Sequence, residues 1–550
     1  MGVNPGDDDL ADGAARACDA GRSGSRRLRK SIAAAAIGIL LLGAASEPAV
    51  AQTLRIGTQS SFVIDPHYRF LGPDMAAARM VFDSFVGRDG ESAWVPALAV
   101  SWRPVNETTW EFKLRPGVTF SDGTPFTADD VAYSFQRVMT LETPSSFRSN
   151  MRSIVRWEAV DPLTLRVVTD RPNAVLPGQL TNIFIVSRKL AGASPDDIQA
   201  GRAALGTGPF KVDAYTNGVR LQLSRNERYW GQKPAWEQVD ERVMSNDAAR
   251  IAALLAGDMD LIDDVAPNDA ATLEHDLAVK VYRHASDRVM FLIPNVRLDS
   301  LPLLTDETGA PLPHNPLRDL RVRRALSLAI NREVLAQRGL DGAAVPNGAL
   351  VPASFGGYDP APPVPPYDPG AARKLLAEAG YPNGFGMTIA CTNDRYFADA
   401  KVCQILGQML ERIGLHMKVE TQPGNVLFPR LRPEINTYPL VLLGQSNSTS
   451  RDPTHVLDLA LHTLDRKAGL GSSNRGGFSD PKLDQMIEAA VERIDGQREV
   501  ALHDAMMYGV EIGAVIPLYT QVVLTAARNS VVYHPRMDEQ TVAQAAFPAR

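Results

Sequence analysis

The sequence predicts an α/β fold, because strand-like and helix-like segments alternate along most of the chain. Trp110, Phe112 and Leu114 alternate with charged residues, which is typical of a half-buried strand. Thr127 and Asp130 have the spacing of a capping box and precede apolar residues at helical intervals. The chain has 550 residues, more than one hydrophobic core ordinarily serves, so we expect two or more large domains.

The same two patterns predict the other elements. Pro116 and Gly117 predict a tight turn, after which residues 118–120 begin a return strand. Further strands are predicted at 163–168, 219–223 and 387–391. Helices are predicted to begin at Asp247, Pro369 and Pro481, to span 321–335, and to carry an apolar stripe over 402–413. We interpret these stripes as core faces and not as cofactor sites.

Composition and motifs exclude several functions. The apolar fraction is 45%, the charged fraction 22% and the net charge −6. Basic residues cluster only near the N-terminus, so no basic stripe suits nucleic acid. The sequence contains no HExxH, GxSxG or GxxxxGK[ST] motif, and the nine His lack metal-ligand spacing. We therefore expect no metal site, no cofactor and no catalytic residue.

The N-terminus has the three parts of a secretory signal. A basic block, Arg26 to Lys30, precedes an apolar run over 32–45 and a small-residue cleavage pattern, Ala49-Val50-Ala51. Fourteen residues are few for a membrane-spanning helix, although an anchor is the alternative. Arg26-Arg27 also leaves a twin-arginine signal open. The sequence predicts a cleaved signal peptide over 1–51, export by the general secretory route and a periplasmic location.

Two of the three cysteines lie in the predicted mature chain. Cys391 ends a predicted strand and Cys403 lies on a predicted helix. In an oxidising compartment these two residues are candidates for a disulfide. The alternative is a pair of small buried side chains.

One long segment resembles a known family. Residues 110–131, WEFKLRPGVTFSDGTPFTADDV, are similar without a gap to the signature of the family 5 extracellular solute-binding proteins, the peptide- and nickel-binding type of ABC importers. Later segments resemble the family's motifs in the same order: GTGPF at 206–210, NERYW at 226–230, AALLAGDMD at 252–260, RVRRAL at 321–326, LAEAGYP at 376–382 and IPLY at 516–519. These motifs have structural explanations, namely turns, caps and close crossings.

The resemblance implies a periplasmic binding protein-like fold of two lobes, with an extra subdomain inserted in the first lobe. We expect the first lobe to comprise 52–86, 183–286 and 516–550, the inserted subdomain 87–182, and the second lobe 287–515. It also implies that hinge closure traps a solute between the lobes and that membrane permease subunits of the importer recognise the closed form. The expected state is a monomer.

The resemblance also suggests where the ligand binds. In the peptide binders of this family, an acidic residue on a second-lobe loop pairs with the ligand's amino group, and a Trp precedes it. The matching loop here has neither residue, and Asp452 lies in the position of a structural Asp-Pro. The loop instead offers uncharged polar groups and one arginine. The candidate ligand-binding residues are Ser60, Ser61, Phe62, Asn393, Arg395, Tyr396, Gln445, Ser446, Asn447, Ser448 and Arg451.

The missing acid favours a small polar organic solute over an ordinary peptide. A modified peptide, an opine or an oligosaccharide-like compound fits uncharged donors and acceptors, with Arg451 available for an anion. The alternatives are an ordinary di- or oligopeptide, a nickel complex, a chaperone that holds unfolded segments and, more remotely, a secreted hydrolase.

Overall fold

The computed structural model describes residues 52–143, 147–194, 197–198, 200–355 and 362–549. The predicted signal peptide, residues 1–51, lies outside the described residues.

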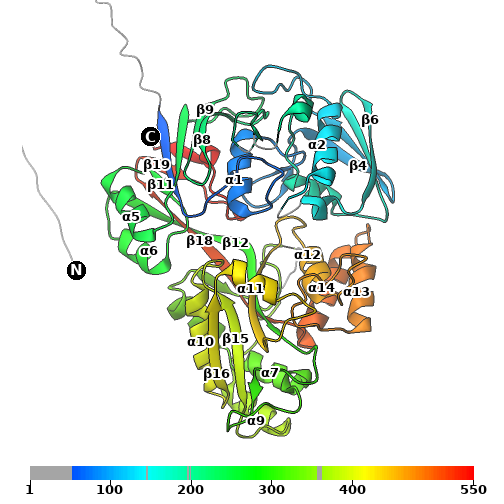
Figure 1. The fold of residues 1–550 in the computed structure, drawn as a ribbon, viewed down its shortest axis with the longest axis vertical. Helices are drawn as coiled ribbons and strands as arrows, with labels where there is room; N and C mark the ends of the chain where they lie inside the picture. The colour runs from blue at the N-terminus through cyan, green and yellow to red at the C-terminus, as the bar shows by residue number, and fades with distance from the viewer. Residues whose placement is uncertain (1–51, 144–146, 195–196, 199, 356–361, 550) are drawn as a thin grey trace, which may run out of the picture. The chain divides into compact units, whose positions relative to one another are not determined.

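One large mixed sheet dominates the fold (Figure 1). Its strands, in spatial order, are β13 (Leu304–Thr305), β15 (Gly386–Thr392), β17 (Leu440–Ser446), β12 (Val279–Pro294), β18 (Ile516–Arg528), β11 (Leu261–Ile262), β1 (Thr53–Thr58), β10 (Gln238–Val243), β9 (Arg220–Arg225) and β8 (Phe210–Thr216), with β14 (Ala344–Pro346) on β18 and β16 (His416–Gln422) on β15.

Two long strands carry this sheet from one half of the fold to the other. Residues 279–285 of β12 pair with 522–528 of β18, and residues 289–292 pair with 516–520. Between these stretches the register shifts, so Ser286 and Asp287 lie in a fully buried bulge. A bulge interrupts the ladder of hydrogen bonds and bends the strand. The two halves of the sheet therefore meet at this bulge.

A separate antiparallel sheet is formed by residues 99–169. Its order is β4 (Ala99–Asn106), β5 (Thr109–Leu114), β7 (Thr164–Thr169) and β6 (Ile154–Asp161). Two small pairs complete the strands: β2 (Gly87–Arg88) with β3 (Trp94–Val95), and β19 (Val531–Tyr533) with β20 (Ala546–Pro548). The four-stranded sheet lies within the range predicted for the inserted subdomain.

Helices cover the sheets. α10 packs along β15 and β16, and α13 packs against α14 (Figure 1). The helices are α1 (Gly72–Val81), α2 (Ala128–Thr140), α3 (Leu176–Gln179), α5 (Asp247–Ala256), α6 (Pro267–Leu273), α7 (Leu320–Leu328), α8 (Arg332–Val334), α9 (Pro369–Glu378), α10 (Asp399–Glu411), α11 (Gly424–Arg430), α12 (Thr454–Val456), α13 (Pro481–Val491) and α14 (Arg498–Glu511). None of these described helices is long and apolar enough to cross a membrane.

Local signals located most elements correctly. The capping box at Thr127 and Asp130 is present at the start of α2, and the predicted strand at 110–114 is β5. Three expectations were wrong. Residues 118–120 form no strand, because β5 pairs with β4 and β7 instead. Asn246, and not Asp247, caps α5. The predicted helix over 321–335 stops at Leu328, because Asn331 caps a new helix, α8.

The GTGP turn is explained by a close approach of two backbones. A Cβ on Gly206 would lie 2.1 Å from the carbonyl oxygen of Val81, and a Cβ on Gly208 would lie 2.5 Å from its carbonyl carbon. Both distances are too short for a side chain, so only glycine lets this turn contact the end of α1.

Candidate functional site

Four residues meet where β12 and β18 change register, and we call them the hinge cluster: Asp287, Arg288, Gln521 and Glu539. The carboxylate of Glu539 accepts a hydrogen bond of 2.7 Å from Arg288 Nη2 and one of 3.1 Å from Gln521 Nε2. Glu539 has a positive φ of 63°, which turns the C-terminal segment at this point. One carboxylate therefore bridges both strands of the crossing.

The charges of the hinge cluster are strongly coupled. Burial tends to raise the pKa of Glu539, but the guanidinium of Arg288 overrides this effect and lowers it. Glu539 in turn raises the pKa of Arg288 against the opposing effect of burial. Burial, together with repulsion from Glu539, raises the pKa of Asp287 to about 7. The ion pair stays charged at neutral pH, whereas Asp287 sits near its titration point.

The predicted binding loop, residues 446–451, lies at this crossing, and we call it the junction loop. Asn447 is fully buried; its backbone N–H donates to the carbonyl of Asp287 and its Nδ2 donates to the carbonyl of Leu350 at 3.0 Å. The amide oxygen, Oδ1, has no hydrogen-bond partner among the described residues, so the backbone N–H and Nδ2 are the groups that anchor the loop to the bulge. The Asn447 side-chain donor is thus engaged within the protein.

The tip of the junction loop contacts the segment that carries β3 and α3. Thr449 accepts a hydrogen bond at its carbonyl from Trp94 Nε1 (3.3 Å) and one at its Oγ1 from Asn182 Nδ2 (3.2 Å). A Cβ on Gly178 would lie 2.1 Å from the Thr449 carbonyl oxygen, so glycine is required there. The loop therefore contacts both halves of the fold.

The other predicted loop residues lie beside the hinge cluster. Ser446 is the register partner of Arg288, and the hydroxyls of Ser446 and Ser448 lie 3.3 Å apart. Gln445 is the register partner of Val289. The guanidinium of Arg451 lies over the ring of Phe355 at 5.3 Å. Ser446, Ser448 and Gln445 therefore place hydroxyl and amide groups beside the point where β12 and β18 change register.

The junction loop contains no acid, and the acid that follows it is not free to replace the missing carboxylate. This residue, Asp452, forms an ion pair with Arg498 and accepts a hydrogen bond from the backbone N–H of Thr454. It therefore has the structural role expected of the residue before Pro453.

A second predicted segment, the loop after β15, approaches the same place. Tyr396 OH donates to the carbonyl of Gly444 at 3.3 Å, and the guanidinium groups of Arg288 and Arg395 lie 5.7 and 5.4 Å from the Tyr396 ring centre. Arg395 and Tyr396 thus adjoin the hinge cluster. Asn393 is exposed and donates its backbone N–H to the carbonyl of Gln422.

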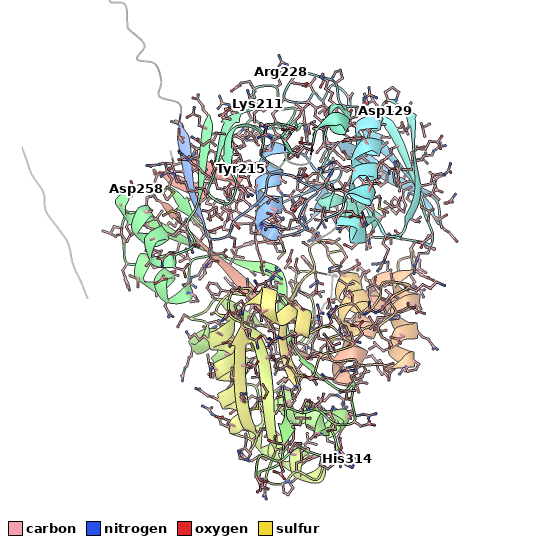
Figure 2. All side chains as sticks on the ribbon, in the orientation of Figure 1. Asp129, Lys211, Tyr215, Arg228, Asp258 and His314 are labelled. Carbon is pink, nitrogen blue, oxygen red and sulfur yellow. A yellow bond between two sulfur atoms is a disulfide. The ribbon has the colours of Figure 1, made fainter. Side chains whose placement is uncertain are left out.

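The third predicted segment, at the end of β1, has a different setting. Phe62 is 1% exposed and stacks on Tyr215, whose hydroxyl donates a hydrogen bond to the Phe62 carbonyl. Tyr215 lies on β8 and is labelled in Figure 2. The Phe62 side chain is therefore part of the core. Ser61 is exposed, and its carbonyl accepts a hydrogen bond from Arg69; Ser60 is half-buried. No described contact joins these three residues to the hinge cluster.

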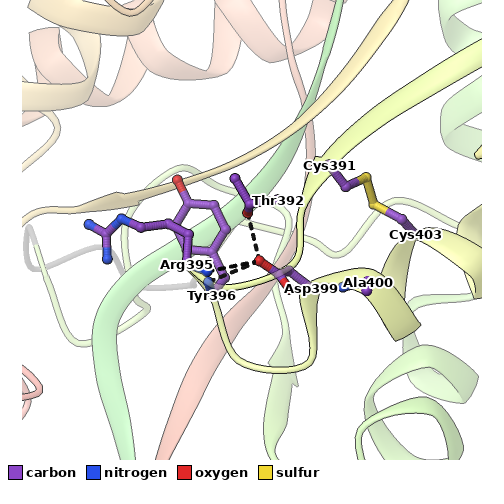
Figure 3. Close-up of a disulfide and its surroundings, with 7 residues drawn as sticks. All are labelled: Cys391, Thr392, Arg395, Tyr396, Asp399, Ala400 and Cys403. Carbon is purple, nitrogen blue, oxygen red and sulfur yellow. Dashed lines mark hydrogen bonds between the residues drawn. A yellow bond between two sulfur atoms is a disulfide. The ribbon is translucent and has the colours of Figure 1, made fainter. Parts of the chain in front are cut away.

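The loop that presents Arg395 is braced from within. The carboxylate of Asp399 accepts hydrogen bonds from Thr392 Oγ1 (2.6 Å) and from the backbone N–H groups of Arg395 and Tyr396 (3.2 and 3.1 Å; Figure 3). Cys391 and Cys403 form a disulfide, which joins the end of β15 to α10. Figure 3 shows the Arg395 and Tyr396 side chains on the opposite side of this loop from the disulfide.

Replacing both Cys391 and Cys403 with alanine is expected to lower the free energy of unfolding by about 2–3 kcal/mol, because the bond closes a short loop in the unfolded chain. Thermal melting with and without reductant measures this effect. Reductant should lower the melting temperature of the wild type and leave the double variant unchanged. Identical melting of oxidised wild type, reduced wild type and double variant would contradict the prediction.

Several charged residues of the site were missed by the sequence analysis. Asp287 and Arg288 contact the junction loop directly, and Glu539 and Arg88 contact it through Arg288 and Asn182, but no motif marks these four residues. Asp287 and Arg288 do interrupt an apolar strand, which is the one signal that could have found them. Glu539 follows a short strand, β19, and reaches the site only through the tertiary fold.

A buried arginine group lies behind the site. Arg79, Arg88 and Arg536 surround the single carboxylate of Asp538, with N···O distances of 4.0, 3.5 and 2.7 Å. Arg88 also donates to Asn182, the residue that contacts the junction loop. Burial would raise the pKa of Asp538, but the three guanidinium groups lower it well below its usual range. Through Arg88 and Asn182, this group of ion pairs supports the residues that contact the junction loop.

A sheet that passes from one half of the fold to the other on two strands, with polar loops beside the crossing, is the architecture of a two-lobed periplasmic binding protein. The family model for bacterial extracellular solute-binding proteins, family 5 Middle, matches residues 93–466. The chain belongs to this family, and it is a solute-binding protein of an ABC importer. Members of the family are extracellular or periplasmic binding proteins.

The curated relatives agree with this assignment. The chain is 30% identical over 422 residues to Protein XP55 of Streptomyces lividans, covering 74% of this chain and 72% of that protein. It is 26% identical over 390 residues to the glutathione-binding protein GsiB of Escherichia coli K12, covering 70% and 72%.

Solved structures share the fold. DppA from Helicobacter pylori, in complex with the peptide STSA, aligns with a TM-score of 0.72 at 22% identity, over 90% of this chain and 98% of that one. AgaA from A. tumefacien R10, in complex with agropinic acid, aligns with a TM-score of 0.71 at 20% identity, over 90% and 99%.

Proposed function

We propose that this protein captures a small polar organic solute, such as a modified peptide or an opine, at the junction of its two lobes and delivers it to the permease of its importer. The junction loop and the loop after β15 supply the ligand contacts, above all Arg395, Tyr396, Gln445, Ser446, Ser448 and Arg451. The observation that carries the proposal is the chemistry of the junction loop, where hydroxyls and amides replace the acid of the peptide binders.

The proposed motion is a rotation of the lobes about the bulge in β12 and its partner residues in β18. We assign residues 52–86, 183–286 and 516–550 to the first lobe, 87–182 to its inserted subdomain and 287–515 to the second. Contacts such as Trp94 with Thr449 form only when the lobes meet. A solute that contacts both walls stabilises that state, because it binds the closed form better than the open one. We further propose periplasmic export through the signal at 1–51, and action as a monomer.

The glutathione-binding relative and the agropinic acid complex support a modified peptide or an opine as the solute, and the DppA complex with STSA supports the alternative, an ordinary peptide. The test is mass spectrometry of any solute that co-purifies with the protein, followed by thermal melting against glutathione, octopine, tripeptides, maltotriose and nickel–histidine. A ligand at 100 times its Kd should add about 2.7 kcal/mol to the free energy of unfolding. The proposal fails if no solute co-purifies and no compound raises the melting temperature.

A further inference from the structure

A pocket lies in the half of the fold that carries β15, β16 and β17, apart from the candidate site at the crossing of β12 and β18. Its volume is about 410 Å³, which is within the usual range of small-molecule sites. The lining residues include Leu303, Glu420, Arg430, Ile435, Thr437 and Tyr438, and we call this cavity the β16 pocket. None of its lining residues belongs to the hinge cluster, the junction loop or the loop after β15.

The β16 pocket lies on the face of the sheet opposite to α10. Successive residues of a strand point to opposite faces, and Cys391 of β15 is joined to α10 by the disulfide. Ala390 therefore points to the other face, where it packs in one core cluster with Leu427 of α11 (Figure 1). Glu420 is the register partner of Ala390 on β16, which pairs with β15 alone among the described strands. Glu420 thus lies at an edge of the sheet, on the face that α11 covers.

A chain of hydrogen bonds fixes the polar wall of the β16 pocket. Tyr438 OH donates to Glu420 Oε1 at 2.7 Å, and Gln422 Nε2 donates both to the Tyr438 hydroxyl at 3.1 Å and to Glu420. Arg430 Nη1 donates to Gln422 Oε1 at 3.1 Å. Tyr438 is 7% exposed, so this wall is held from inside the protein. Side chains that are already held in place lose little freedom when a ligand binds.

Both ends of this chain keep hydrogen-bonding capacity that the protein leaves unused. Glu420 Oε2 accepts no hydrogen bond, and neither Glu420 nor Arg430 forms an ion pair, within the described part of the chain. Burial, then the bond to Glu420, raises the pKa of Tyr438, whereas Arg430 acts to lower it. The acid and the guanidinium therefore flank the same phenol hydroxyl, and both line the pocket.

The opposite charges on this wall favour a neutral ligand. A carboxylate repels an anionic ligand, and a guanidinium repels a cationic one. A hydroxyl group can donate to Glu420 and accept from Arg430, and the exposed Thr437 hydroxyl can bind a further one. Leu303 and Ile435 form an apolar wall, and Ile435 is 49% exposed. Adjacent hydroxyls on a carbon frame, as in a saccharide or a polyol, match this combination of a polar and an apolar wall.

We propose that the β16 pocket is a second ligand site, which binds a neutral saccharide or polyol through Glu420 and Arg430. The hydroxyl groups of the ligand bind these two side chains, and its C–H groups pack on Leu303 and Ile435. This site differs from the proposed solute site, because its lining residues all fall within 287–515, the range assigned to one lobe. A ligand held by one lobe binds the open and the closed state equally and does not drive closure. The β16 pocket can therefore stay occupied while the transported solute enters and leaves.

The experiment compares Glu420→Gln and Arg430→Gln with two matched controls, Glu411→Gln and Arg412→Gln. The control side chains are exposed and lie at the end of α10, on the opposite face of the sheet. Each protein is titrated calorimetrically with glucose, cellobiose and sorbitol as neutral probes, and with glucuronate and glucosamine as charged analogues. Ile435→Ala is a third variant, which shortens the apolar wall and leaves the chain of hydrogen bonds intact. Thermal melting without ligand verifies that every variant folds.

We expect at least one neutral probe to bind the wild type and both controls, and the charged analogues to bind more weakly than glucose. Glu420→Gln and Arg430→Gln should each weaken the neutral probe about tenfold or more, because each removes a hydrogen bond to a charged group. Ile435→Ala should weaken it about threefold, because less apolar surface is buried. Binding of the transported solute should be the same in all of these proteins.

The inference is overturned if no neutral probe binds, if the variants bind it as the wild type does, or if either charged analogue binds more tightly than glucose. Each of these outcomes leaves the proposed function intact, because that function rests on the junction loop, in which no residue is changed.

Discussion

Replacing Asp538 with asparagine is expected to lower the free energy of unfolding by about 3–5 kcal/mol, since removing one partner of a buried ionic group leaves the others uncompensated. Asp538 is the carboxylate shared by Arg79, Arg88 and Arg536, and its side chain is 2% exposed. Burial and the neighbouring positive charges already lower the pKa of Arg79 to about 9. The three arginines therefore depend on the one carboxylate of Asp538 to balance their positive charge.

Denaturant unfolding at pH 7 measures this effect, with Asp258→Asn as the control for the same chemical change at an exposed position. The double variant Asp538→Asn/Arg79→Met should recover part of the loss, because it removes one of the unpaired cations. A loss below about 1 kcal/mol in the single variant would show that the arginines find other partners. Weakened solute binding should accompany the loss, because Arg88 also holds Asn182 against the junction loop.

Replacing Glu241 with glutamine is expected to stabilise the protein at alkaline pH and to change little at pH 5. Glu241 lies on β10 and is 4% exposed; burial, with added repulsion from Asp263, raises its pKa to about 8. The folded state therefore binds a proton that the unfolded state releases near pH 4.5. This contribution to stability is fully present below that pH and falls as pH rises toward 8, by on the order of 5 kcal/mol.

Glutamine stays neutral throughout, so we expect the free energy of unfolding to rise by about 2 kcal/mol at pH 8.5. The gain is smaller than the full cost of ionising Glu241, because a buried amide without all its hydrogen bonds is itself destabilising. Guanidinium unfolding of both proteins at pH 5 and pH 8.5 tests this, with Glu307→Gln as an exposed control. Equal stability of wild type and Glu241→Gln at both pH values would mean that Glu241 is ionised in the folded protein at no cost.

Much of the fold could be predicted from the sequence because its signals are local. The alternation in β5, the capping box of α2 and the glycine that ends α5 each depend on residues a few positions apart. The family signature is a strand, a turn and a capped helix, and it therefore identified the family. The errors arose where two local signals competed, as at Asn331, where the cap of a new helix ended the preceding one.

The sequence by itself thus determined the α/β class and the family, and two of its three predicted binding segments lie beside the crossing of β12 and β18. The charges around those segments were decided only by the tertiary structure. Glu539 meets Arg288 across 251 residues of chain, at the point where one sheet passes between the two halves of the fold on two strands. Charges act through space and not along the chain, so no spacing in the sequence reveals which of them are paired with one another.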